Sequence, residues 1–213
     1  MPEPDRILLL CTAHLQADFD RFARLGTLLR RERQAAAGAP VFVLDLGDSG
    51  ADGVWLCQAT EGRAPFVVLD AVGYDLAVTG KLEGNDLTPE ALEMLRDTVA
   101  MTLLPWQASA RLARGDVAFE VTTGGGERSP FVRLDLDRAT VPEQGSPLSE
   151  IGDVPPRSLL RLVVAWPEWQ GRDVALLDID AAAPDPVVQA AIDFVMSEAR
   201  AYAQRKGESH DSG

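Results

Sequence analysis

The sequence has few cysteines and no long hydrophobic run. Only Cys11 and Cys57 occur among the 213 residues, too few for a disulfide framework, and we expect both to be reduced structural thiols. No apolar run approaches the roughly 18 residues of a membrane-spanning helix. The first residues, MPEPDR, also lack a basic segment followed by an apolar stretch. We therefore expect a soluble, cytoplasmic protein.

Basic residues are scarce as well. The chain has 20 Lys and Arg against 33 Asp and Glu, a net charge of −13, which argues against nucleic acid or an anionic membrane as a partner. The 46% apolar content is ordinary for a globular protein, and the chain is long enough to bury a sizeable core. No repeat or heptad divides it. We predict one domain over residues 1–206, with a soft change of character near 103–106 and a disordered polar tail over 207–213.

Three short apolar runs dominate the first half, and helical patterns separate them. The runs are ILLLCTAH (7–14), VFVLDLGDSGADG (41–53) and DLAVTG (75–80). Asp18 is a plausible cap for the first helix, residues 63–72 read as the second, and Thr88-Pro89 is a strong start for the third. This alternation predicts a mostly parallel sheet with helical crossovers. The carboxyl ends of such strands share one edge, where open α/β sheets place their sites.

The second half predicts turn-linked, more antiparallel strands that form a second layer. Candidate strands lie at 117–122, 131–136, 159–166 and 174–179. A final helix over 186–203 is expected to bury one apolar face made of Val187, Ala191, Phe194, Val195 and Ala199.

Two motifs in this half leave their roles open. The stretch Trp166-Pro167-Glu168-Trp169 fits a recognition surface or a core anchor. Asp178, Asp180 and Asp185 lack the glycine and terminal glutamate of a calcium loop, which favours solvated turns.

The order of the segments carries a resemblance. ILLLCTAH, FARLGTLL, VLDLGDS, GYDLAVTGKLE and TPEALEML follow one another over residues 7 to 100. Together they resemble the N-terminal half of a calcineurin-like metallophosphoesterase, closest to the 5′-nucleotidase branch. The resemblance implies a layered αββα architecture of the α/β class, with a mostly parallel first sheet.

The resemblance also implies a two-metal site, which the chain matches only in part. The family's Asp-x-His pair falls on Thr12 and His14, and its Gly-Asp on Gly47-Asp48. Its asparagine ligand falls on Lys81, its catalytic histidine on Leu82 and its glutamate on Glu83. Two-metal catalysis needs several anionic and imidazole ligands. Threonine is a weak ligand and an ammonium group repels a cation, so this pattern predicts a catalytically silent domain.

We therefore predict no catalytic residue, no metal and no cofactor, and a binding or structural module that acts through an unknown protein partner or self-association. The vestigial crevice would comprise Thr12, His14, Asp48, Ser49, Lys81, Leu82 and Glu83. His14 and Asp48 can equally be a structural histidine and a turn former. We expect the Lys81 ammonium within ion-pair reach of Asp48 or Glu83. The alternative is a hydrolase of phosphate esters or nucleotides with Mn or Zn at His14 and Asp48, supported by Glu83 and Asp86.

Overall fold

A computed structural model describes residues 5–79, 87–123, 132–133, 150–151, 154–168 and 170–210. Helices and strands follow one another in this order: β1 Arg6–Thr12, α1 Phe19–Ala35, β2 Val41–Asp45, α2 Trp55–Ala59, α3 Ala64–Val72, β3 Leu76–Thr79, α4 Pro89–Thr98, β4 Thr102–Pro105, β5 Ser109–Arg114, β6 Val117–Thr123, β7 Val132–Arg133, β8 Glu150–Ile151, β9 Ser158–Ala165, β10 Gln170–Asp178 and α5 Pro186–His210.

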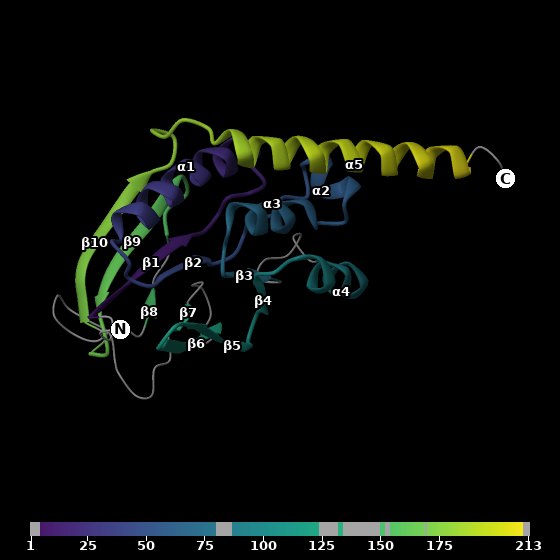
Figure 1. Cartoon of the computed structure of the whole chain (residues 1–213). Coiled ribbons are helices and arrows are strands. Elements are labelled where there is room, and N and C mark those ends of the chain that lie inside the picture. Colours follow the sequence, from purple (N-terminus) through teal and green to yellow (C-terminus); the bar gives the residue numbers. More distant parts are fainter. Residues whose placement is uncertain are drawn as a thin grey trace.

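The larger sheet contains the three apolar runs of the first half as neighbours. Its strand order is β10-β9-β1-β2-β3-β4, and β1 to β4 are parallel (Figure 1). The predicted adjacency of the first three strands is confirmed. Thr12 of β1 lies in register with Asp45 of β2, so both strands end at the same edge of the sheet.

The later strands divide between two sheets. β5 to β8 form a separate antiparallel sheet, as the turn-rich sequence predicts. β9 and β10 instead extend the larger sheet, where β9 pairs antiparallel with β1. The reason lies in β9, which buries Leu159 toward the helices and Leu162 and Val164 toward the smaller sheet. A strand that is apolar on both faces is stabilised best inside a sheet covered on both sides.

Two hydrophobic clusters lie on opposite faces of the larger sheet. Along β1, Leu8 and Leu10 pack toward α1, α3 and α5, whereas Ile7, Leu9 and Cys11 pack toward the smaller sheet. Helices therefore cover one face of the larger sheet and strands cover the other, which gives the predicted layered α/β architecture (Figure 1).

Local capping signals in the sequence are confirmed. The Asp18 carboxylate accepts from the Arg21 amide at the start of α1, and the Thr88 hydroxyl accepts from the Ala91 amide at the start of α4. α3 ends at Gly73, whose φ of 91° is the left-handed conformation that glycine adopts without steric cost.

The buried face of α5 differs from the prediction. Val187 and Phe194 are 70% and 66% exposed, and the buried stripe is Val188, Ile192 and Val195 with Ala199. Val195 and Ala199 are buried as predicted. Val187 and Phe194 are not, because contact with α1 and α3 buries Val188 and Ile192 instead. At Gly26 of α1 a Cβ atom would lie 2.6 Å from Cγ2 of Val188, so only a glycine allows α1 and α5 this close.

The two ends of α5 also differ from the prediction. Asp185 is buried rather than in a solvated turn: it pairs with Arg30 and accepts from the Val187 amide at 2.8 Å. The helix continues to His210, beyond the predicted end at residue 203. Gln204, Arg205 and Lys206 are good helix formers, which favours extension past Ala203. In the described part of the chain, no helix is long and apolar enough to span a membrane.

Candidate functional site

The loops after β1 and β2 run side by side and are joined by main-chain hydrogen bonds. The amide of His14 donates to the carbonyl of Gly47 at 3.0 Å, Gln16 donates to Asp48 at 3.0 Å, and Ala17 donates to Ser49 at 2.8 Å. These bonds hold the two loops as one unit at the carboxyl edge of the sheet. We call Thr12, His14, Asp48 and Ser49 the strand-end site.

Several residues of these loops have left-handed backbone conformations. The φ angles are 56° at His14, 49° at Gln16, 52° at Ala17 and 62° at Asp48. Such angles are unfavourable for residues other than glycine, asparagine and aspartate, and they persist only where surrounding contacts impose them. Here the main-chain bonds between the two loops impose them.

His14 and Asp48 contact each other directly. His14 Nδ1 lies 2.9 Å from Asp48 Oδ2, and their side chains are 20% and 7% exposed. Gln16 Nε2 also approaches the same carboxylate oxygen at 3.4 Å. Beside them Ser49 is buried, and its hydroxyl has no hydrogen-bond partner among the described residues.

Thr12 forms a different set of contacts, inside the protein. Its hydroxyl donates to Asp45 Oδ1 at 3.2 Å and lies 2.9 Å from the hydroxyl of Tyr74, and all three residues are buried. A hydroxyl has one proton, so Tyr74 donates to Thr12 when Thr12 donates to Asp45. Burial, and then the charge of Asp45, raises the pKa of both Tyr74 and Cys11.

Sequence reasoning missed Asp45 and Tyr74. Asp45 could have been found, because it is a carboxylate inside the apolar run of β2. Parallel pairing of the two strands places it in register with Thr12. Nothing in the sequence pattern pointed to Tyr74, which begins the segment before β3. Lys81, Leu82, Glu83 and Asp86 lie outside the described residues, so the expected ion pair of Lys81 remains a prediction.

No protein-family profile and no curated protein matches the chain. Solved structures do. Calcineurin-like phosphoesterase YfkN from Bacillus subtilis is 11% identical with a TM-score of 0.56, over 93% of this chain and 99% of that one. The fold is that of the calcineurin-like metallophosphoesterases.

Two further solved structures are similar to this chain. Sulfate thiohydrolase SoxB of Thermus thermophilus is 13% identical (TM-score 0.57), over 93% of this chain and 61% of that one. NAD nucleotidase NadN of Haemophilus influenzae is 9% identical (TM-score 0.51), over 97% of this chain and 60% of that one. The chain thus corresponds to about 60% of the length of each of these two proteins.

The calcineurin-like fold implies metal ions, and the described part of the strand-end site does not fit a two-metal centre. No group of three His, Cys, Asp or Glu side chains there could hold an ion. His14 and Asp48 supply one imidazole and one carboxylate, and they face each other. Thr12 points its hydroxyl at Asp45 and Tyr74. Two-metal sites need more charged donors than this set provides.

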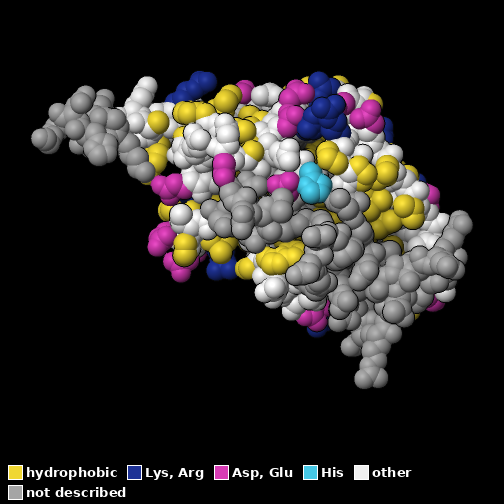
Figure 2. Space-filling view, turned by 180° about the vertical axis from the view of Figure 1, so that it is seen from behind, with side chains coloured by type: hydrophobic (Ala, Val, Ile, Leu, Met, Phe, Trp, Pro, Cys, Tyr) yellow, Lys and Arg dark blue, Asp and Glu magenta, His cyan; other side chains and the backbone are white. Residues whose placement is uncertain are grey.

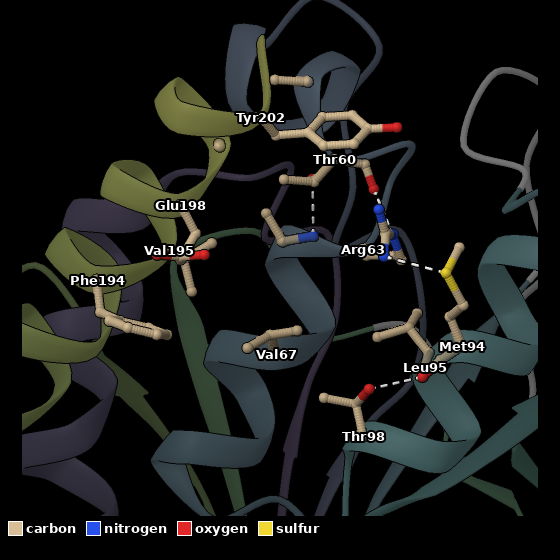
Figure 3. Close-up of a pocket in the computed structure, with 13 residues that line it drawn as sticks. Thr60, Arg63, Val67, Met94, Leu95, Thr98, Phe194, Val195, Glu198 and Tyr202 are labelled. Atoms are coloured by element: carbon tan, nitrogen blue, oxygen red, sulfur yellow. Dashed lines mark hydrogen bonds between the residues drawn. The ribbon is translucent and has the colours of Figure 1, made fainter. Parts of the chain in front are cut away.

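A separate groove of about 270 Å³ lies among the helices (Figure 3). Arg63, the residue before α3, lines it and donates from Nε to the Thr60 carbonyl at 2.9 Å. Its Nη1 lies 3.6 Å from Met94 Sδ. The sequence did not predict this groove. Most of its lining is apolar: Ala59, Ala64, Val67, Met94, Leu95, Phe194, Val195 and Ala199, with Thr60, Arg63, Thr98, Glu198 and Tyr202.

Proposed function

We propose that the chain is a catalytically silent metallophosphoesterase-like domain that acts as a binding or structural module. The observation that carries this proposal is the position of Thr12. Where the resemblance places a carboxylate ligand, the chain has a neutral hydroxyl that is buried and engaged by Asp45 and Tyr74. A hydroxyl in these contacts is a poor ligand for a divalent cation.

The contact between His14 and Asp48 supports the same proposal. An ionised carboxylate only accepts hydrogen bonds, so Nδ1 of His14 carries the proton in this contact. In this tautomer Nδ1 has no lone pair, so His14 and Asp48 cannot share an ion across this contact. Only Nε2 of His14 would keep a lone pair for a metal.

Hydrolysis of a chromogenic phosphomonoester and phosphodiester in the presence of manganese tests the proposal. We expect no turnover above the buffer blank. Asp48→Asn, purified in the same way, is the matched control because asparagine also tolerates the left-handed backbone. Turnover by the wild type that disappears in Asp48→Asn would show that the domain is an enzyme.

The second candidate is a phosphoesterase or nucleotidase with one Mn or Zn ion at His14 and Asp48. The observation that favours it is the clustering of left-handed residues at this site, because such strain concentrates at functional sites. The names of the similar structures, a phosphoesterase and a nucleotidase, agree with it. Elemental analysis after dialysis against manganese and zinc tests this candidate. One ion per chain that is lost in His14→Gln would favour it.

We also propose that Lys81 replaces the metal electrostatically by neutralising Asp48 or Glu83. The basis is the resemblance, which places Lys81 where a metal ligand stands, together with the largely buried carboxylate of Asp48. Lys81→Met should lower the free energy of unfolding by about 3 kcal/mol for a buried pair and by under about 1 kcal/mol for an exposed one. Urea denaturation measures the difference, and an unchanged stability would contradict the proposal.

A further inference from the structure

Strand β10 forms one edge of the larger sheet. All of its residues but Arg172 pair with β9 on one side, and no described strand pairs with the other side (Figure 1). An open edge presents a row of main-chain donors and acceptors that can pair with another strand.

The middle of this edge exposes two aliphatic side chains. Val174 and Leu176 are 63% and 56% exposed, and they lie opposite Leu162 and Leu160 of β9, on the face turned toward the smaller sheet. In Figure 2, hydrophobic side chains gather on the part of the surface that corresponds to β9 and β10. Proteins usually protect such edges with charged side chains, proline or a bulge. In β10 the charges and the bulge lie toward the ends, at Arg172, Asp173 and Asp178, and the stretch 174–177 between them has none of these features.

We propose that β10 pairs antiparallel with β10 of a second copy of this chain, around a two-fold axis at Ala175. In this register Val174 faces the partner's Leu176, and Leu176 faces the partner's Val174, so the exposed aliphatic side chains cover one another. Asp178 comes to the end of the partner strand where Arg172 lies in the bulge, so groups of opposite charge are near each other there. The strand is therefore complementary to itself, which favours a second copy over an unrelated strand.

This inference deepens the proposed function, because it names the partner of the binding module. Net charge opposes the association, since each copy carries −13. Salt screens that repulsion, so the dimer should become tighter as ionic strength rises. A strand from a basic partner would show the opposite salt dependence.

Light scattering on a size-exclusion column and sedimentation velocity, each at low and high salt, test the proposal. We expect the wild type to dimerise and Leu176→Lys to be monomeric, because the added ammonium would be buried in the pairing. Val187→Lys is the matched control: it places the same charge at an exposed valine of α5 and should leave the dimer intact. A monomeric wild type at every concentration and salt tested, or a dimeric Leu176→Lys, would overturn the proposal.

A cysteine cross-link tests the register without relying on Leu176→Lys folding. Directly opposed residues of antiparallel strands have Cβ atoms about 4.5–5.5 Å apart, near disulfide distance. Ala175→Cys should therefore give a disulfide-linked dimer on mild oxidation, whereas Val187→Cys should stay monomeric on a non-reducing gel. Equal cross-linking of both variants, or none, would overturn the register. Neither readout depends on hydrolysis, so this proposal and catalytic silence can fail separately.

Discussion

Several residues at the strand ends have backbone conformations that are uncommon for residues other than glycine. Asp48 has a left-handed backbone, an imidazole partner at 2.9 Å and a mostly buried side chain. The residue type is constrained twice, once by the backbone and once by His14. Substitutions can separate the two constraints.

Asp48→Asn should cost less stability than Asp48→Ala. Both remove the negative charge beside His14, but asparagine adopts positive φ more easily than alanine does. We expect Asp48→Ala to be less stable than Asp48→Asn by about 1 kcal/mol. Urea denaturation of the two variants measures the difference. Equal stabilities would show that the loop relaxes its backbone when the carboxylate is removed.

Tyr74 gives the protein an alkaline pH dependence. Burial raises the pKa of its phenol above the ordinary value of 10.0, so the folded protein keeps a proton that the unfolded chain releases. This contribution to stability is fully present below pH 10.0 and is lost as the pH rises further. In Tyr74→Phe the free energy of unfolding should therefore fall less steeply between about pH 9 and pH 11.

The Tyr74→Phe variant also loses the hydrogen bond to Thr12. At neutral pH we expect it to be about 1 kcal/mol less stable than the wild type. Cys11 remains in the variant and its pKa is raised in the same direction, so part of the alkaline loss persists. The free energy of unfolding is plotted against pH for the wild type and for Tyr74→Phe. Two plots with the same slope over the whole pH range would argue against a protonated, buried Tyr74.

At the scale of elements, α5 shows how packing selects a helix face. The helix is apolar over more than one face, with Val187 and Phe194 on one side and Ile192 and Val195 on another. Contact with α1 and α3 decides which side is buried. The other side of α5 stays at the protein surface and exposes apolar side chains, as β10 does at the sheet edge.

Truncating one residue from each side of α5 should give very different losses of stability. Ile192 is 2% exposed, and Ile192→Ala should cost about 3 kcal/mol. Phe194 is 66% exposed, and Phe194→Ala should cost under about 1 kcal/mol. Thermal and urea unfolding of the pair test the assignment. A larger loss from Phe194→Ala would mean that the groove of Figure 3 holds the ring more tightly than its exposure indicates.

At the scale of the whole molecule, acidic residues outnumber basic ones by 13. Local pairs such as Arg24–Asp20 and Arg114–Asp75 join one basic and one acidic residue each, so they leave this excess unchanged. The excess charge repels itself across the surface and destabilises the compact state.

Salt should therefore stabilise the folded protein. Raising sodium chloride from about 0.02 M to about 0.5 M shortens the screening length and should raise Tm by a few degrees. Scanning calorimetry at one low protein concentration measures this effect with little contribution from dimer formation. A Tm that falls with salt would mean that the ion pairs outweigh the net repulsion.

Local physical chemistry in the sequence determined many of the elements and the parallel part of the larger sheet, although α2, β4 and β5 were not predicted. Apolar runs of strand length, the caps at Asp18 and Thr88, and the glycine after α3 act within a few residues, and the structure contains all of them. The order of the strand and helix patterns was enough to predict β1, β2 and β3 as neighbours, and the resemblance of the sequence blocks to a known family implied the calcineurin-like fold.

Only the tertiary structure decided which side chains meet. Thr12 contacts Asp45 and Tyr74, which are 33 and 62 residues away along the chain, and no local pattern encodes such a contact. The same holds for β9 and β10, which joined the larger sheet, and for the face of α5 that became buried. Strand pairing and helix docking depend on burial against surfaces that exist only once the rest of the chain has packed. The hydrophobic periodicity of the sequence therefore does not determine them.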